Sequence, residues 1–79
     1  MKKSDIQVRI KNIISALMEI PVDQIKDDSS PDTIEVWDSL RHINLVMTLE
    51  EEFGVQFSDN EIAELINVKL IIAVLMEKL

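Results

Sequence analysis

The chain has 79 residues, no cysteine and a formal net charge of −7. This length suits one small domain, so we expect a single domain over residues 1–79. The acidic charge argues against binding to nucleic acid or to anionic membrane surfaces, and it favours a basic protein partner. The absence of cysteine excludes a disulfide framework and a thiolate metal site.

The first helix is predicted to begin at Ser4, because Ser4-Asp5-Ile6-Gln7 fits the S-x-x-Q capping box. Its apolar residues repeat at i, i+4, i+7, i+8 and i+11, which is the stripe of an amphipathic helix. They are Ile6, Ile10, Ile13, Ile14 and Leu17. Pro21 lies just beyond its end.

Residues 19–38 carry no sustained helix or strand pattern, and a loop of this length in a small domain is unusual. Apolar residues spaced through it are expected to hold it against the helices. They are Ile20, Val22, Ile25, Ile34, Val36 and Trp37. The aspartates of this loop do not follow the order of ligands in a calcium-binding EF-hand, so we predict no metal site.

Three further helices are predicted from their end signals. The second begins near Asp38 and Ser39 and ends around Gly54, a natural left-handed stop. The third is short and begins with a capping box at Ser58. The fold class is therefore all-α: a small four-helix bundle of three longer helices and one short one, with a long loop between the first two.

The last helix is capped by Asn67 and is apolar almost all round. Its inward stripe is predicted to be Val68, Ile71, Ile72, Leu75 and Leu79. Leu70, Val74 and Met76 add apolar surface on other faces. Either the first loop covers this surface, or it is a partner or dimer contact. We favour the covering loop and expect a monomer.

Ser39 is the residue best placed for chemistry. With Asp38 as the N-cap, Ser39 becomes the first helical residue, and its hydroxyl lies at the positive end of the helix dipole. Backbone N–H groups and this dipole favour a phosphate there. Taken alone, however, Asp38 and Ser39 are also ordinary residues for the start of a helix.

The longer segment from Asp38 to Gly54 resembles the acyl carrier protein family, whose hallmark is Asp-Ser-Leu at the start of the second helix. The resemblance includes Leu45-Val46-Met47, Leu49-Glu50-Glu51-Glu52-Phe53 and the short acidic helix that follows. It implies that a phosphopantetheinyl transferase, using coenzyme A and magnesium, attaches a 4′-phosphopantetheine arm to Ser39, with Asp38 in a supporting role. The thiol of the arm would then carry an acyl group as a thioester.

The resemblance implies a carrier and not an enzyme. A serine nucleophile needs an adjacent base, and the one histidine of the chain, His42, lies three residues along the same helix. We interpret His42 as a solvated helix residue and Trp37 as a loop anchor on the core. A bound chain would be sheltered by a core cavity, whose candidate lining residues are Ile14, Leu45, Leu49, Phe53, Ile62 and Ile71.

In this family the second helix is the main recognition element. Its acidic residues would steer enzymes with basic docking patches, and its apolar residues would supply contact area. The predicted contacts are Leu40, Ile43, Met47, Glu50 and Glu51. The partners implied are the transferase and acyl-transferring or condensing enzymes of a fatty-acid, polyketide or other specialised acyl pathway. Because the chain has no signal peptide and no apolar run long enough to span a bilayer, we expect a cytoplasmic location.

Departures from the family pattern favour a specialised member. Fatty-acid carriers have a glycine shortly before the hallmark, whereas this chain has Val36 and Trp37. They also have acidic residues in the first turns of the helix, whereas this chain has Arg41, His42 and Asn44. We therefore prefer a carrier that serves one dedicated pathway.

Two alternatives stay open. The first is a carrier of aminoacyl or D-alanyl groups with the same fold, although the Gly-Gly pair of peptidyl carriers is absent and Leu40 stands where D-alanyl carriers have phenylalanine. The second is an unmodified helical module that binds a partner helix through Leu70 and Val74.

Overall fold

The computed structural model describes residues 2–79, which form four α-helices and one 3-10 turn. The elements are α1 (Lys3–Met18), η1 (Val22–Gln24), α2 (Ser39–Phe53), α3 (Asp59–Glu64) and α4 (Val68–Lys78). The described residues contain no strand. The predicted all-α fold, with three longer helices and one short one, is confirmed.

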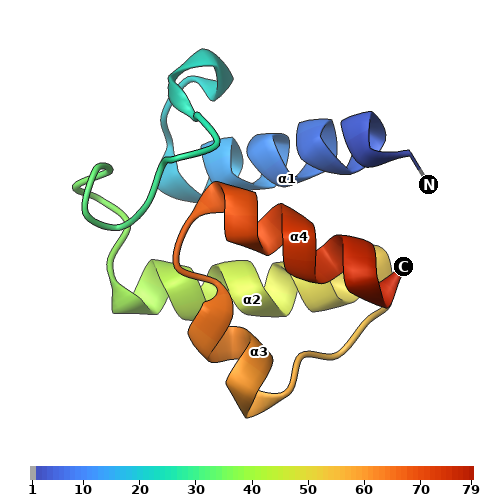
Figure 1. Ribbon diagram of the computed structural model, residues 1–79. Coiled ribbons are helices and arrows are strands. Elements are labelled where there is room, and N and C mark those ends of the chain that lie inside the picture. Colours follow the sequence, from blue (N-terminus) through green and yellow to red (C-terminus); the bar gives the residue numbers. More distant parts are fainter. Residues whose placement is uncertain (1) are drawn as a thin grey trace.

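The helices pack around a shared core. Helix α1 contacts both α2 and α4, and α3 contacts α4. Helix α1 runs in the opposite direction to α2 and α4, and the short α3 lies across them (Figure 1). The chain between α1 and α2 lies at the end of the bundle where α2 and α4 begin (Figure 1).

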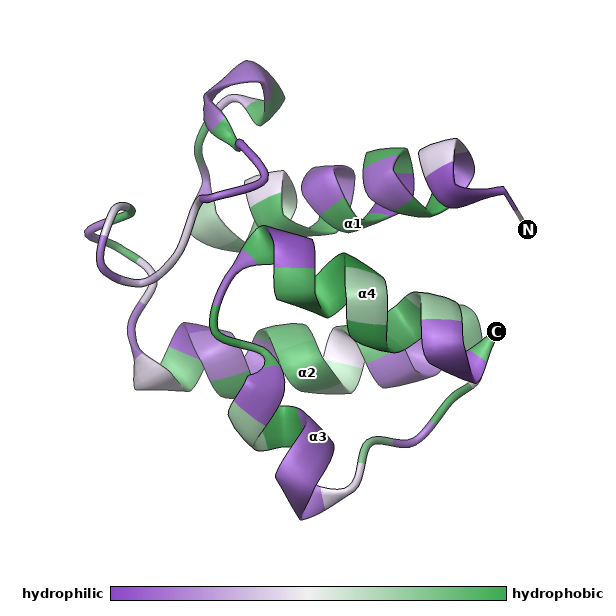
Figure 2. Cartoon of the chain, viewed as in Figure 1, coloured by the Kyte–Doolittle hydropathy of each residue, from purple (hydrophilic) through white to green (hydrophobic). Residues whose placement is uncertain are grey.

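The core is formed by the apolar stripes that the sequence predicts. In α1, Ile6, Ile10 and Ile14 are fully buried, with Met18 continuing the stripe. Figure 2 shows α4 as hydrophobic along most of its length, and this helix lies between α1 and α2 in that view. The buried residues of α4 are Val68, Ile71, Ile72, Val74 and Leu75.

The first loop covers the start of α4. The backbone N–H groups of Val68 and Lys69 donate to the carbonyl oxygens of Ser29 and Asp27, at 3.0 and 2.8 Å. Val74, which was predicted to add apolar surface on another face, is only 4% exposed, whereas Met76 is exposed. The prediction that the first loop covers α4 is therefore supported at the start of the helix only.

Three residues anchor the loop itself. Ile25, Ile34 and Trp37 are buried, so Trp37 is confirmed as a loop anchor. Ser29 is the one buried polar residue recorded within residues 2–79, and its hydroxyl accepts a hydrogen bond from the backbone N–H of Lys26. The loop is thus held by apolar contacts and by local hydrogen bonds that satisfy its backbone.

Several local predictions are wrong. Helix α1 begins at Lys3, with Lys2 as a cap that makes no side-chain hydrogen bond, so Ser4 lies inside the first turn and is not the cap. The Lys2 carbonyl accepts from Asp5 and Ile6, which starts the helix before Ser4. Leu79 is exposed because it follows the last turn of α4 that meets the core.

Two loop residues also differ from expectation. Val22 and Val36 are 45% and 40% exposed and do not pin the loop. Val22 lies in the short 3-10 turn, which has no buried residue. The loop therefore rests on fewer apolar anchors than the sequence suggests.

No helix within residues 2–79 is long and apolar enough to cross a membrane.

Candidate attachment site at the start of helix α2

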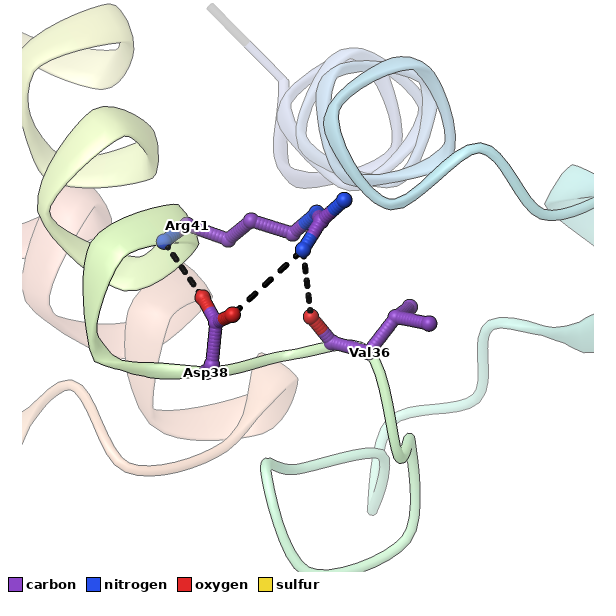
Figure 3. A network of polar contacts seen from close by, with 3 residues as sticks. All are labelled: Val36, Asp38 and Arg41. Atoms are coloured by element: carbon purple, nitrogen blue, oxygen red, sulfur yellow. Dashed lines mark hydrogen bonds and ion pairs between the residues drawn. The ribbon is translucent and has the colours of Figure 1, made fainter.

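The cap of α2 forms as predicted. Asp38 has extended backbone angles, φ −93° and ψ −178°, and its Oδ1 accepts a hydrogen bond from the backbone N–H of Arg41 at 2.9 Å (Figure 3). The carbonyl oxygen of Asp38 accepts the first helical hydrogen bond, from the N–H of His42 at 2.9 Å. Ser39 is therefore the first residue of the helix.

The side chain of Arg41 ties the end of the loop to this first turn. One guanidinium nitrogen lies 3.4 Å from Asp38 Oδ2 and 3.4 Å from the carbonyl oxygen of Val36 (Figure 3). Because these groups are partly exposed, the ion pair is worth only about 0–1 kcal/mol. Its main effect is positional, since it holds residues 36–38 beside the start of the helix.

Ser39 is exposed, and its hydroxyl has no hydrogen-bond partner recorded among the described residues. Attachment of a group to this oxygen therefore breaks no recorded hydrogen bond within that part of the chain. The first backbone N–H groups of α2 are unpaired within the helix and stabilise negative charge at its start. A phosphodiester on Ser39 therefore fits the local charge and the available space.

A hollow of about 620 Å³ lies beside Ser39. It is formed by the first loop, the first two turns of α2 and the turn between α3 and α4. Its lining residues are Pro31, Asp32, Trp37, Asp38, Ser39, His42, Ile43, Leu65 and Ile66. Its volume falls within the usual range for small-molecule sites, about 300–1,000 Å³.

The hollow is not lined by the residues proposed for a sheltering cavity. Ile14, Leu45, Leu49 and Ile71 are fully buried in the core, and Phe53 and Ile62 are partly buried against it. Leu65 and Ile66 were not predicted as neighbours of Ser39. The signal that could have indicated them is their position in the turn between α3 and α4, directly before the cap residue Asn67.

The interpretation of His42 as a solvated helix residue is wrong. The indole Nε1–H of Trp37 donates to His42 Nδ1 at 3.1 Å, and the two rings stack with centroids 6.1 Å apart. Partial burial lowers the pKa of His42 below its ordinary value. Because its Nδ1 already accepts from Trp37, His42 is not arranged as a base for Ser39.

The apolar residues expected to contact partners share one exposed face of α2. Leu40, Ile43 and Met47 follow the helical spacing of three and four residues, and each is more than half exposed. Ile66, from the turn after α3, is also more than half exposed and lines the same hollow as Ile43. These side chains therefore offer apolar area close to Ser39.

The acidic residues at the other end of α2 have different environments. Glu51 is exposed. Glu50 is half-buried, and its Oε2 accepts a hydrogen bond from the backbone N–H of Phe57 at 2.9 Å. Glu52 forms an ion pair with Arg9. Within residues 2–79, the run of three glutamates is thus divided between Glu51, for which no partner is recorded, and two glutamates that contact other parts of the fold.

Comparisons with known proteins identify the family to which the chain is similar. A family profile described as "Phosphopantetheine attachment site" matches residues 8–75. The chain is 32% identical over 78 residues to the acyl carrier protein of Chloroherpeton thalassium, covering 99% of this chain and 98% of that protein. It is 32% identical over 80 residues to the acyl carrier protein of Petrotoga mobilis, covering 100% and 93%. It is 43% identical over 63 residues to the acyl carrier protein of Buchnera aphidicola, covering 80% and 78%.

The chain therefore belongs to the acyl carrier protein family. Its prosthetic group is a covalently attached phosphopantetheine. Residues 2–79 contain no group of three or more histidine or acidic side chains that could hold a metal ion.

Proposed function

We propose that the protein carries acyl groups as thioesters on a 4′-phosphopantetheine arm attached to Ser39. The observation that carries this proposal is the exposed Ser39 hydroxyl at the positive end of α2, within the Asp38-Ser39-Leu40 hallmark. Ser4 and Ser58 also stand at helix starts, but neither precedes the apolar face of α2. Ser39 also borders a hollow with apolar walls.

Attachment forms a bond between Ser39 Oγ and the phosphorus of the phosphopantetheine that coenzyme A supplies, and it releases adenosine 3′,5′-bisphosphate. The proton of the Ser39 hydroxyl must leave to a base. His42 does not serve, because its Nδ1 accepts from Trp37. We therefore assign the base to the phosphopantetheinyl transferase, which makes attachment dependent on a separate enzyme.

Once attached, the arm supplies the thiol that holds the acyl group. The chain has no cysteine that could accept the acyl group in its place. The contribution of the protein is to fix the position of Ser39 through the Asp38 cap and the Trp37 anchor. In this proposal the protein positions its cargo, and partner enzymes perform the chemistry.

Partner enzymes are proposed to dock on the exposed face of α2. Leu40, Ile43 and Met47 supply apolar contact, and Glu51 steers a basic patch of the partner. Glu50 is the weaker candidate, since its carboxylate already holds the backbone of Phe57. Arg41 stands close to Ser39, which favours enzymes of a dedicated acyl pathway over those that need acidic residues there.

The test is the intact mass of the protein after incubation with coenzyme A, magnesium and a phosphopantetheinyl transferase. We expect one arm per chain and none on the Ser39→Ala variant. Ser4→Ala is the matched control, because Ser4 is also an exposed serine in the first turn of a helix, and it should be modified like the wild type. The proposal would be refuted if the Ser39→Ala variant gained the mass of an arm, or if the wild type gained no mass with several transferases.

The cargo is identified by mass spectrometry of the protein isolated from its native source. An acyl thioester on the arm supports the proposed function. If the arm instead carries an aminoacyl or D-alanyl thioester, Ser39 is still the attachment site but the proposed acyl cargo is wrong.

A further inference from the structure

The one tryptophan and the one histidine of the chain meet at the wall of the hollow beside Ser39. The cap of α2 does not require this pair, because the Asp38 side chain and the Asp38 carbonyl oxygen already start the helix. Burial of Trp37 explains the loop anchor. It does not explain why the indole N–H is directed at an imidazole in the same hollow.

The hydrogen bond fixes the proton of His42. An indole Nε1–H is a donor only, so the Nδ1 that accepts from Trp37 carries no proton. A neutral imidazole then carries its proton on Nε2. No partner of Nε2 is recorded within residues 2–79, and no side-chain nitrogen or oxygen in that range is both buried and unpaired. The Nε2–H group is therefore unpaired within this range and not completely buried.

The residue that carries this donor is a neighbour of the attachment point on the helix. Ser39 and His42 are three residues apart on α2, and residues at this spacing are neighbours on a helix surface, with Cβ atoms about 5–6 Å apart. Both residues line the same hollow. A phosphate on Ser39 would thus lie next to a fixed N–H donor in partly buried surroundings, where a hydrogen bond to an anion is strong.

We propose that His42 is a positioning residue whose Nε2–H donates a hydrogen bond to a phosphodiester oxygen of the arm on Ser39, directing the arm along the hollow. This inference rests on the proposed attachment at Ser39. The bond would restrict rotation of the arm about its first bonds. It would also add a contact that a carrier with an aliphatic residue at this position does not have.

Titration of His42 makes its hydrogen bond with Trp37 sensitive to pH. Asp32 of the loop and Asp38 at the start of α2 line the same hollow, whereas the turn after α3 contributes only the uncharged Leu65 and Ile66. Protonation of Nδ1 would turn two N–H donors toward each other and break the bond from Trp37. Burial lowers the pKa of His42 in the unmodified protein, and an anionic phosphate bound at Nε2 should raise it again.

The test is NMR spectroscopy of the protein with and without its arm. Because the chain has a single histidine and a single tryptophan, the imidazole signals belong to His42 and the indole signals belong to Trp37. We expect the pKa of His42 to rise when the arm is attached. We also expect the ³¹P signal of the phosphodiester and the indole N–H signal of Trp37 to change with the same pH midpoint as His42.

Two variants separate the arm contact from the structural role of the ring. H42N places an amide near the position of Nδ1, where it can accept from Trp37, but it has no donor at the position of Nε2. H42Q places its amide nitrogen near the position of Nε2. We expect the ³¹P signal and the arm relaxation of H42Q to approach those of the wild type at high pH, and those of H42N to resemble a freely moving arm.

The outcomes are distinguishable. If the arm attaches but the His42 pKa and the ³¹P signal are unchanged, the inference fails and the proposed function stands. If the pKa rises but H42Q behaves like H42N, the phosphate acts only through its charge and the hydrogen bond is refuted. If no arm attaches to Ser39, the proposed function itself fails.

Discussion

Replacing Asp38 by alanine tests whether the cap of α2 presents Ser39. The change removes the oxygen that accepts from the Arg41 N–H at 2.9 Å, and it removes the carboxylate that pairs with the Arg41 guanidinium. Loss of an N-cap costs typically about 1 kcal/mol, and the partly exposed ion pair adds less than about 1 kcal/mol. For a domain of this size, a loss of about 1 kcal/mol lowers Tm by about 4–8 °C and leaves the protein folded at room temperature.

The assay compares urea unfolding with the rate of mass gain in the presence of a transferase. We expect Asp38→Ala to slow attachment at least about tenfold, which corresponds to about 1.4 kcal/mol in the transition state. This loss cannot come from unfolding, because nearly all of the variant remains folded. It would come from fraying of the first turn, which no longer holds the Ser39 hydroxyl in place.

Asp38→Asn is the matched control. An asparagine caps a helix about as well as an aspartate, so the free energy of unfolding should fall only by the contribution of the lost ion pair with Arg41, which is less than about 1 kcal/mol. We expect its rate of attachment to lie above that of Asp38→Ala. Attachment to Asp38→Ala at nearly the wild-type rate would refute the role given to the cap.

Three other changes test neighbouring features. Glu51→Lys should weaken binding to a basic partner in titration calorimetry and change the free energy of unfolding by less than about 0.5 kcal/mol. Glu50→Lys should destabilise the protein by about 1–3 kcal/mol, because the Phe57 N–H loses its charged acceptor. Equal stability of the two variants would contradict this difference between the two glutamates. Gly54→Ala should cost about 1 kcal/mol in urea unfolding, because Gly54 has φ +64° and the added methyl meets only open space; a neutral result would refute left-handed strain as its cause. The contribution of neutral His42 to the free energy of unfolding should be fully present above about pH 6.5, and it should be lost as the pH drops through the lowered pKa of His42, because the unfolded state binds the proton first. His42→Gln should lose this part of the pH dependence. An unchanged pH profile of this variant in unfolding titrations would contradict the prediction.

The helix ends of the second half of the chain could be predicted because their signals are local. Asp38, Ser58 and Asn67 each accept from the backbone three residues on, and Gly54 takes the left-handed conformation that ends α2. Such hydrogen bonds depend on a few consecutive residues, so the sequence contains them in full. Ser4 shows the limit of this reasoning, because a serine in the first turn is compatible with a helix that starts before it.

The surroundings of Ser39 could not be predicted, because they depend on where the long loop lies. Trp37 and His42 stand at the N′ and N4 positions around the Asp38 cap, where side chains often pack together, but the hydrogen bond between their rings depends on the path of the chain into α2. The same holds for Ile66, which reaches the hollow from the turn after α3. The role of Glu50 also depends on a backbone N–H seven residues away, across the end of its own helix.

The register of α2 decides both the exposure of Ser39 and its neighbours. Successive residues turn by about 100° around the helix axis, and the buried residues Leu45, Val46 and Leu49 span an arc of about 100° that faces the core. His42 lies within this arc and Ser39 lies about 20° beyond its edge, which matches a half-buried imidazole next to an exposed hydroxyl. Leu40 and Met47 lie about 150–170° from the middle of the arc, so the face proposed for docking is nearly opposite the core. The residues that bury α2 therefore also fix the attachment site at the edge between its buried and its exposed face, where an arm can reach both the hollow and a docked enzyme.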